Sequence, residues 1–552
     1  MKLHSLHEID STEGTVQLHD VLNGGQLILH PSPNPHDPND PLRWPRWKKH
    51  ICFASICAFT FLTNYAIGGL SPAFYIISLE YKKSQTETTG LLLWPILVLG
   101  AFNFFWVPIA NYFGKRPVFV FASLLLCVCY LWGALSKSFE SLFWSNIIAA
   151  FAGSSSEALG AAIVNDLYFL HERGNFLGIY MNAIAGGNTV GPLICGFIIT
   201  SLDWRWHKWI AFIFTAINFV IVLLFCPETR YDRSYIEGVV ARGRSVESNL
   251  ATPTSDQEAG NGVPAEKVVS STAEPKPDYA ALRGEQLPKK TWAQNLSLWS
   301  GVPTDTNLLE LFIRPLPLIA YPAVVFAFIS YAVSLAWVVA INVLNSFILQ
   351  APPYNWKPSI NGLINIPGII GNLVGAFLGG WVVDRYSDWR SRKNNGVFQP
   401  ETRLHLLWIS AIVVPAGCLA FGYGVAYSLN WTSLSVCSPT TVPLHLLTAL
   451  HRFFGYGMVA VGLTAVPVAT MTYVSDCYLP VNADALLLVN GLKNIVAFAF
   501  LFAIVPWIAE TGYVNAFGTQ AGVYFLIMLF AIPLIFFGQR IRHATGKWKI
   551  IL

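Results

Sequence analysis

The chain has 552 residues, of which 54% are hydrophobic and only 12% charged, with a net charge of +4 and a mean hydropathy of +0.48. Soluble domains carry about 25% charged residues, so this chain has too few polar side chains to cover a water-facing surface. The net charge is small and the basic residues are spread along the chain, which argues against nucleic acid as a partner.

Apolar stretches of about 20 residues, each long enough to cross a bilayer, recur along the chain and predict an all-α polytopic membrane protein. The runs are continuous, whereas the strands of a membrane β-barrel alternate. We expect about twelve transmembrane helices in two six-helix bundles. The expected spans lie near residues 50–78, 90–110, 117–136, 141–165, 175–201, 207–227, 317–349, 359–383, 404–427, 443–474, 484–508 and 519–539.

The regions between and around these spans divide the chain into five parts. Residues 1–48 form a polar tail without the apolar segment of a cleavable signal peptide. The two bundles are expected over residues 49–227 and 315–540. Between them, residues 228–314 are rich in Pro, Ser, Thr and Glu, which predicts a largely disordered loop. Residues 541–552 form the second tail.

Positive residues predict the orientation. If the N-terminus is cytoplasmic, the inner flanks hold sixteen Lys and Arg residues and the outer loops six. Because Lys and Arg favour the cytoplasmic side, we expect both tails and the central loop inside. The sequon N-W-T then places Asn430 outside, where it is a candidate glycosylation site.

Glu157, in the stretch "GSSSEALG", is the most informative residue of the fourth span. It lies about 24 Å from the outer end of that span, at 1.5 Å per residue. A charge inside the membrane costs about 2.5–3.5 kcal/mol, so we expect the helix face with Gly153, Glu157 and Gly160 to border a wet cavity. There the carboxyl group can couple proton movement to cargo or attract a cationic substrate. A structural acid, satisfied by nearby hydroxyls or amides, is the alternative.

Other polar residues inside the expected spans are candidates for the substrate path. Amides in membranes often only bond neighbouring helices, at about 0.6–2 kcal/mol each, so each has a structural alternative. Besides Glu157, the candidates for proton coupling or the path are Lys493, Asn494, Arg452, Asn64, Asn342 and Asn345.

Several short motifs occur in a characteristic order along the chain. They are "NPHDPNDPLRWPRWKK" before span 1, "DLYFLHERGNFLGIY" between spans 4 and 5, "GNTVGPLICGF" in span 5, "PETRY" after span 6 and "VNGLKNIVAFAF" in span 11. With them the chain resembles the major facilitator superfamily, and more closely its fungal drug:proton antiporter-like branch, over residues 34–540. The resemblance implies alternating access around a site near mid-membrane between the two halves.

The resemblance also implies gating residues. The loop after span 2 resembles the signature G-x-x-x-D-R-x-G-R-R, which latches helices at the cytoplasmic face, but Asn111 replaces its acid and weakens a charge-based latch. Alternatively, Lys115 and Arg116 in this loop only set the membrane topology and do not act as a latch. The implied gating residues are Gly114, Lys115, Arg116, Asp384 and Arg385, together with Gly187, Gly191, Pro192 and Gly196 of an antiporter signature in span 5. The cytoplasmic loop after span 4 adds Asp166, Glu172 and Arg173.

The favoured function is proton-coupled secondary transport of small organic molecules, as an exporter of drugs, toxins or secondary metabolites. The alternatives are an uptake carrier for organic cations such as polyamines and a non-transporting receptor on the same scaffold. The sequence has no H-E-x-x-H, P-loop or G-x-S-x-G motif, so we expect no enzyme, no cofactor and no metal. The expected setting is a monomer in the plasma membrane, with lipid, protons and a small organic substrate as partners.

Overall fold

The computed structural model describes residues 3–6, 14–20, 26–34, 37–231, 288–297, 307–350, 356–434 and 442–551. Most of the central segment 228–314, for which we expected disorder, lies outside the described residues. In the helices near residues 427–453, only the backbone is described. Asn430 and Arg452 fall in this stretch, so the roles expected for their side chains lie outside the described part of the chain.

The first bundle is built mainly from long helices, and capping residues or glycine mark some of their ends. A capping box of Ser84 and Glu87 starts α4, and Gly114, with a φ of 106°, separates α4 from α5. The helices are α2 (Arg46–Gly68), the short α3 (Phe74–Glu80), α4 (Gln85–Phe113), α5 (Lys115–Ala134), α6 (Phe139–Leu167), α7 (Arg173–Ser201) and α8 (Arg205–Phe225).

The second bundle follows two short helices, α10 (Trp292–Asn295) and α11 (Leu308–Ile313). One of its crossings, Pro358–Lys393, is assembled from α13, α14, a π-helical turn at Leu378–Val382 and α15. The helices are α12 (Pro322–Gln350), α13 (Pro358–Leu363), α14 (Asn365–Phe377), α15 (Val383–Lys393), α16 (Leu407–Leu434), α17 (Val442–Cys477), α18 (Asn482–Leu529) and α19 (Ala531–Gly546).

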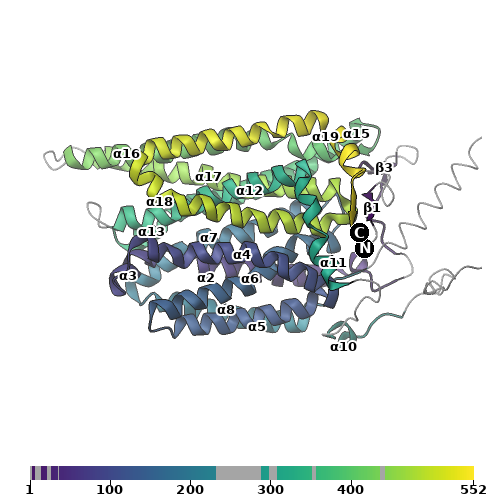
Figure 1. Cartoon of the computed structure of the whole chain (residues 1–552), viewed down its shortest axis with the longest axis horizontal. Helices are drawn as coiled ribbons and strands as arrows, with labels where there is room; N and C mark the ends of the chain where they lie inside the picture. Colours follow the sequence, from purple (N-terminus) through teal and green to yellow (C-terminus); the bar gives the residue numbers. More distant parts are fainter. Residues whose placement is uncertain are drawn as a thin grey trace, which may run out of the picture.

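The described residues contain eleven helical stretches long and apolar enough to cross a membrane. The last, Leu479–Gly546, has 68 residues, which is about 100 Å at 1.5 Å per residue and far more than one crossing requires. Gly512, with φ 79° and ψ 165°, divides it into two antiparallel arms (Figure 1). The described residues therefore give twelve crossings, and the predicted all-α, two-bundle fold is confirmed.

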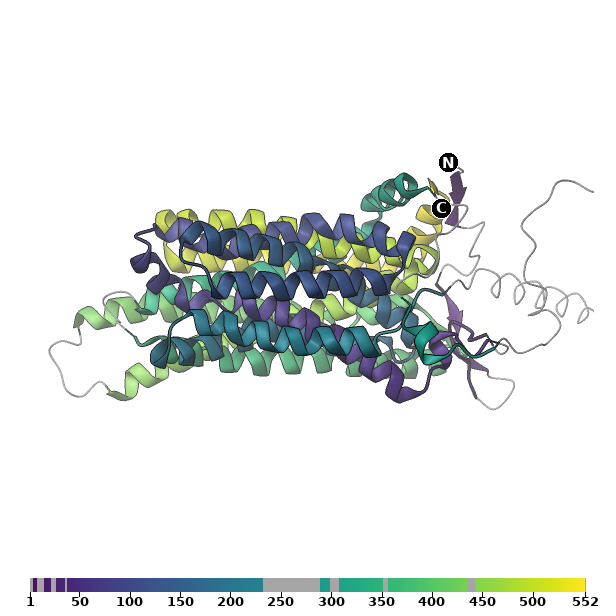
Figure 2. The same ribbon diagram turned by 90° about the horizontal axis from the view of Figure 1, so that it is seen from below.

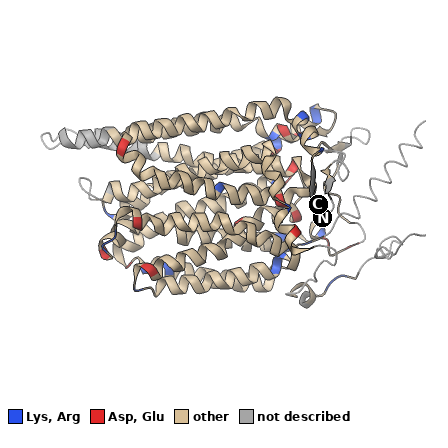
Figure 3. Ribbon diagram, viewed as in Figure 1, with Lys and Arg blue, Asp and Glu red and all other residues tan. Residues whose placement is uncertain are grey.

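The two bundles lie side by side with their helices nearly parallel (Figures 1 and 2). Across the boundary, α4 packs on α18, and α7 packs on α13 and α14. Charged residues gather at the two ends of the helices, and the middle is almost free of them (Figure 3). Both termini lie at one end (Figure 1), which also carries the end of α6 and the start of α7. We call it the terminal face.

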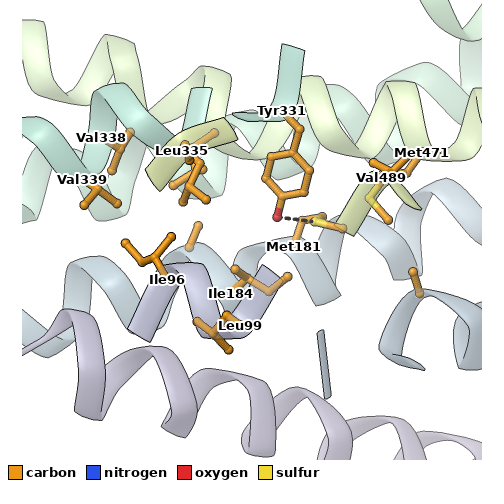
Figure 4. Packing of buried hydrophobic residues seen from close by; sticks show 14 of the residues in the cluster. Ile96, Leu99, Met181, Ile184, Tyr331, Leu335, Val338, Val339, Met471 and Val489 are labelled. Carbon is orange, nitrogen blue, oxygen red and sulfur yellow. Dashed lines mark hydrogen bonds between the residues drawn. The ribbon is translucent and has the colours of Figure 1, made fainter. Parts of the chain in front are cut away.

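The core extends across the boundary between the bundles. Figure 4 shows Ile96 and Leu99 of α4 and Ile184 of α7 facing Leu335 and Val338 of α12. All five are buried. Apolar packing thus joins the two halves around the polar groups described below.

Three short antiparallel strand pairs cover the terminal face. The first joins the two ends of the chain, and the second joins the N-terminal tail to the loop after α15. The pairs are β1 (Leu3–Ser5) with β6 (Lys549–Ile551), β2 (Val16–Gln17) with β5 (Val397–Phe398), and β3 (His19–Asp20) with β4 (Gln26–Leu27).

We predict that Gly512→Ala destabilises the protein because its backbone lies in a region that only glycine adopts readily, at a cost of about 1–3 kcal/mol. Gly518→Ala is the matched control, since Gly518 lies in the same helix with open space around it. Melting temperatures of the two purified variants provide the measurement. Equal melting temperatures would contradict the assigned turn.

Candidate functional site

A buried ion pair joins the two bundles near the middle of the membrane-spanning helices. Glu157 projects from α6 of the first bundle and Lys493 from α18 of the second. The Lys493 Nζ lies 3.3 Å from the Glu157 Oε2, and the two side chains are only 1% and 3% exposed. The structure therefore brings together two of the residues predicted for proton coupling or the substrate path.

Polar neighbours complete the coordination of both charges. The Asn494 amide donates a hydrogen bond to the Glu157 Oε2 at 3.0 Å. Lys493 donates to the Tyr331 hydroxyl of α12 at 2.8 Å, and its Nζ lies 4.0 Å from the centre of the same ring. The Tyr331 hydroxyl in turn contacts the Met181 sulfur of α7 at 3.5 Å (Figure 4). Groups from four helices of both bundles thus meet at one point.

The pair is stable only while both partners remain charged and in place. Taking a charge out of water costs several kcal/mol, and the partner's charge and hydrogen bonds must offset that cost. Loss of one charge leaves the other buried without compensation, which costs about 3–5 kcal/mol. The arrangement can therefore link a change in protonation to a change in how the bundles fit together.

The wet cavity expected beside Glu157 is not open in this structure, because Glu157, Lys493 and Asn494 are all buried. The serines next to Glu157 do not line a passage either. Ser154, Ser155 and Ser156 donate hydrogen bonds to carbonyl oxygens one turn back in their own helix. On the same face, Gly153 lets Thr63 of α2 approach and Gly160 lets Tyr180 of α7 approach, where a Cβ atom would clash.

A second polar chain crosses the boundary through amide side chains. Asn188 of α7 donates to the Asn64 Oδ1 of α2 at 3.1 Å, and Asn342 of α12 donates to the Asn188 carbonyl oxygen at 3.3 Å. Asn345, on the same helix as Asn342, is buried at 5% exposure. Of the amides expected on the path, Asn64 and Asn342 thus bond α7 in this closed arrangement.

A network of charges closes the terminal face. Arg403, at the start of the crossing that contains α16, lies 2.7 Å from Asp384 of α15 and also pairs with Asp476 at the end of α17. Arg173, the first residue of α7, lies 3.8 Å from Asp476. Since Arg173 belongs to the first bundle and the other three residues to the second, the network spans both.

Asp384 also caps a helix of the opposite bundle. Its Oδ2 accepts a hydrogen bond from the backbone amide of Asn175 at 2.8 Å, in the first turn of α7. The free amides and positive dipole end of a helix favour a carboxylate there. Gly174 makes room for it, because a Cβ atom would lie 2.3 Å from the carboxylate. Arg385, which we expected to act with Asp384, instead lies over the Trp381 ring at 5.9 Å.

The corresponding loop of the first half stays within its own bundle. Lys115 pairs with Asp166 at the end of α6. Arg116 donates to carbonyl oxygens at the end of α8, and Glu228 accepts the backbone amides of Lys115 and Arg116 at 3.1 Å each. These contacts fix the loop to α5, α6 and α8 rather than to the second bundle.

Beyond α6, the loop carries His171 and Glu172, 3.9 Å apart. Burial lowers the pKa of His171 below its usual value of 6.5, and the Glu172 carboxylate only partly opposes this. His171 is therefore uncharged at neutral pH. Glu172 makes no described contact with the second bundle.

The antiporter-like segment of α7 provides close helix contacts. Gly187 and Gly191 lie against the backbone of α2, and Gly196 lies against α13 of the second bundle. A Cβ atom on Gly196 would come within 2.5 Å of the Pro358 carbonyl oxygen. Pro192 lies between these glycines, and its carbonyl faces Gly362. The segment thus permits tight packing both within the first bundle and across the boundary.

Arg403 and Asp476 were not predicted as site residues from the sequence. A signal for Asp476 was present, because "SDCY" (475–478) repeats "NDLY" (165–168) at the same position in the second half. The two repeats also touch, since the Asn165 amide donates to the Ser475 hydroxyl at 3.1 Å.

At the opposite end, α8 carries a buried lysine in its first turn. Lys208 donates to the Ala66 carbonyl oxygen and to the Asn146 Oδ1, both at 2.7 Å. The carbonyl of Ala66 lies in the last turn of α2, where helix carbonyls lack partners and a cation is favourable. This position explains Lys208 as a helix cap.

Comparison with known proteins agrees with this architecture. The family model of the Major Facilitator Superfamily matches residues 54–476. The chain belongs to this superfamily.

Two fungal relatives also match most of the chain. An uncharacterized MFS-type transporter of Schizosaccharomyces pombe is 26% identical over 96% of this chain and 90% of its own length. The MFS antiporter QDR3 of Candida albicans is 25% identical over 81% of this chain and 71% of its own. The solved structure of the proton:xylose symporter XylE covers 90% of this chain and 96% of its own, with a TM-score of 0.55 and 14% identity, so it shares the fold. The resemblance seen in the motifs is confirmed, and the chain is a multi-pass membrane transporter by family.

We predict that Asp384→Asn weakens closure of the terminal face and lowers the melting temperature, because it removes the charge that holds Arg403 and caps α7. Breaking such a buried pair costs about 3–5 kcal/mol. Arg385→Gln, one residue away and exposed, is the control and should melt close to the unchanged protein. An Asp384→Asn protein as stable as the control would contradict the network.

Proposed function

We propose that this protein is a proton-coupled secondary transporter of small organic molecules that works by alternating access. The observation that carries this proposal is the Glu157–Lys493 pair, a titratable carboxylate held by a cation of the opposite bundle. Glu157 is the proton-coupling residue, and Lys493 is its reversible counterion.

Protonation of Glu157 cancels its attraction to Lys493 and leaves the ammonium group buried without a counterion. The bundles then gain by separating on one side, where water reaches Lys493. Deprotonation restores the pair and the closed arrangement. The proton is thereby taken up in one state and released in another, which is the requirement for coupling its flow to the movement of cargo.

Two sets of contacts act as the gates in this proposal. At the terminal face, Asp384 and its partners hold α7 to the second bundle. At the other end, Gln350 of α12 donates to the Pro72 carbonyl oxygen at 2.9 Å, and Gly196 packs on Gly362. Both sets are formed here, as in an occluded intermediate, and each access state requires that one set opens.

We assign the terminal face to the cytoplasm, because Lys and Arg are concentrated in the segments that form it. Asn430 then lies on the outer side as a glycosylation site. The setting is the plasma membrane and the transporter acts as a monomer. Export is the proposed direction, supported by the antiporter signature in α7 and by the relative whose name describes it as an antiporter.

A second candidate is transport of organic cations, and one observation favours it. The Lys493 ammonium lies between a carboxylate, a phenol oxygen and an aromatic ring face. These are the groups that an alkylammonium cargo would need. A cationic cargo could therefore replace Lys493 at Glu157 when the bundles open.

We predict that Glu157→Gln abolishes flux driven by a pH gradient and leaves the protein folded, because glutamine keeps the shape and the hydrogen bond from Asn494 but cannot titrate. Glu140→Gln is the matched control, since Glu140 lies on the exposed first turn of the same helix. Flux is measured in inside-out vesicles.

An acidic lumen in these vesicles should drive cargo inwards if the protein is an exporter. A panel of primary amines and neutral aromatic compounds then separates the two candidate cargo classes. Unchanged pH-driven flux in Glu157→Gln would contradict the coupling role of Glu157. Cargo loss from acidic vesicles would contradict export.

A further inference from the structure

The N-terminal tail lies across the terminal face and touches both bundles. We call its described part, residues 14–20 and 26–34, the N-terminal strap. It folds back on itself through the β3–β4 pair and a hydrogen bond from the Ile28 amide to the Leu18 carbonyl oxygen at 2.8 Å. Its composition is polar, yet Leu18 is only 4% exposed.

The strap is bound to the second bundle by backbone and charge. β2 pairs with β5 in the loop after α15, and the Leu18 amide donates to the Gly396 carbonyl oxygen at 2.9 Å. The His19 Nε2 lies 2.7 Å from the Asp388 Oδ1 of α15. Gly14 lies so close to the Asp476 carbonyl oxygen that a Cβ atom would clash with it.

The strap is bound to the first bundle through the loop between α6 and α7. The Leu170 amide donates to the His30 carbonyl oxygen at 2.8 Å. Leu18, Leu170 and Phe398 form a small apolar cluster separate from the main core. One residue comes from the strap, one from the first bundle and one from the second, so the cluster exists only while all three are together.

The strap also lies directly over the charge network of the gate. The Leu170 carbonyl oxygen accepts a hydrogen bond from Arg403, whose other partners are Asp384 and Asp476. Leu170 is thus held from one side by the gate and from the other by the strap. A movement that separates α7 from α15 must pull Leu170 away from Phe398 and break the cluster.

We propose that the N-terminal strap is an inhibitory lid of the terminal face. It binds to the surface formed by Leu170, Gly396 and Phe398 when the bundles are closed there, and it leaves before that face opens. The strap therefore stabilises the closed face and slows access to the central site from this side. The proposal rests on the alternating-access mechanism, but not on proton coupling or on the identity of the cargo.

The test measures access to a buried gate position in the full-length protein. Ser475→Cys places a thiol at the contact with Asn165, where the side chain is 3% exposed. Opening is measured as the rate at which a membrane-impermeant maleimide labels this thiol. The labelling of the protein that lacks the added cysteine is subtracted. Adding Leu18→Asp removes the buried leucine of the apolar cluster and should raise the rate at least about tenfold, which corresponds to about 1.4 kcal/mol.

Leu29→Asp is the matched control, because Leu29 lies on the same strap but is 38% exposed. It should leave the labelling rate unchanged. His19→Ala is a second, milder variant, which removes the contact with Asp388 and should raise the rate severalfold. Unchanged labelling in both Leu18→Asp and His19→Ala would overturn the proposal. An equal increase in Leu29→Asp would also overturn it, because any charge on the tail would then have the same effect.

Discussion

The buried pair of Glu157 and Lys493 is the constraint on which the arrangement of the two bundles depends. Each charge comes from a different half of the chain, and both side chains are buried. The helices around them must therefore approach closely enough for Tyr331 and Asn494 to complete the coordination. In the proposed mechanism, a proton on Glu157 or a competing cation leaves one of the two charges buried without its partner, and the closed arrangement is destabilised.

The two halves of the fold close the terminal face unequally. The second half keeps an acid, Asp384, that reaches the first turn of α7 in the opposite bundle. The first half has Asn111 at the equivalent position, and its basic residues Lys115 and Arg116 bond to α6 and α8 of their own bundle. Closure at this face therefore depends on the second-half contacts, and the N-terminal strap covers those same contacts. Under the proposed mechanism, opening of this face is therefore regulated separately from opening of the opposite face.

The sequence predicted the spans and the buried charges, because hydrocarbon imposes both a helix length and a high cost on each charge. It could not predict pairings, since Glu157 and Lys493 lie far apart in sequence and nothing local favours one partner over another. Asp384 illustrates the same limit, because its partner is Arg403 and not the adjacent Arg385. The contacts of the strap could not be predicted, because most of them are made by backbone atoms and leave no periodic pattern in the sequence. The roles of Ser154–Ser156 also depended on rotamers that sequence does not specify.

A double-mutant cycle of Glu157→Gln and Lys493→Gln on thermal stability tests the central claim most directly. If the two side chains form the pair that holds the bundles, the second substitution adds little once the first is made. The double variant should then lose about as much stability as either single variant, about 3–5 kcal/mol, which is far less than the sum of the two single losses. Losses that add to within about 0.5 kcal/mol would mean that the two charges do not depend on each other, and the account would be wrong.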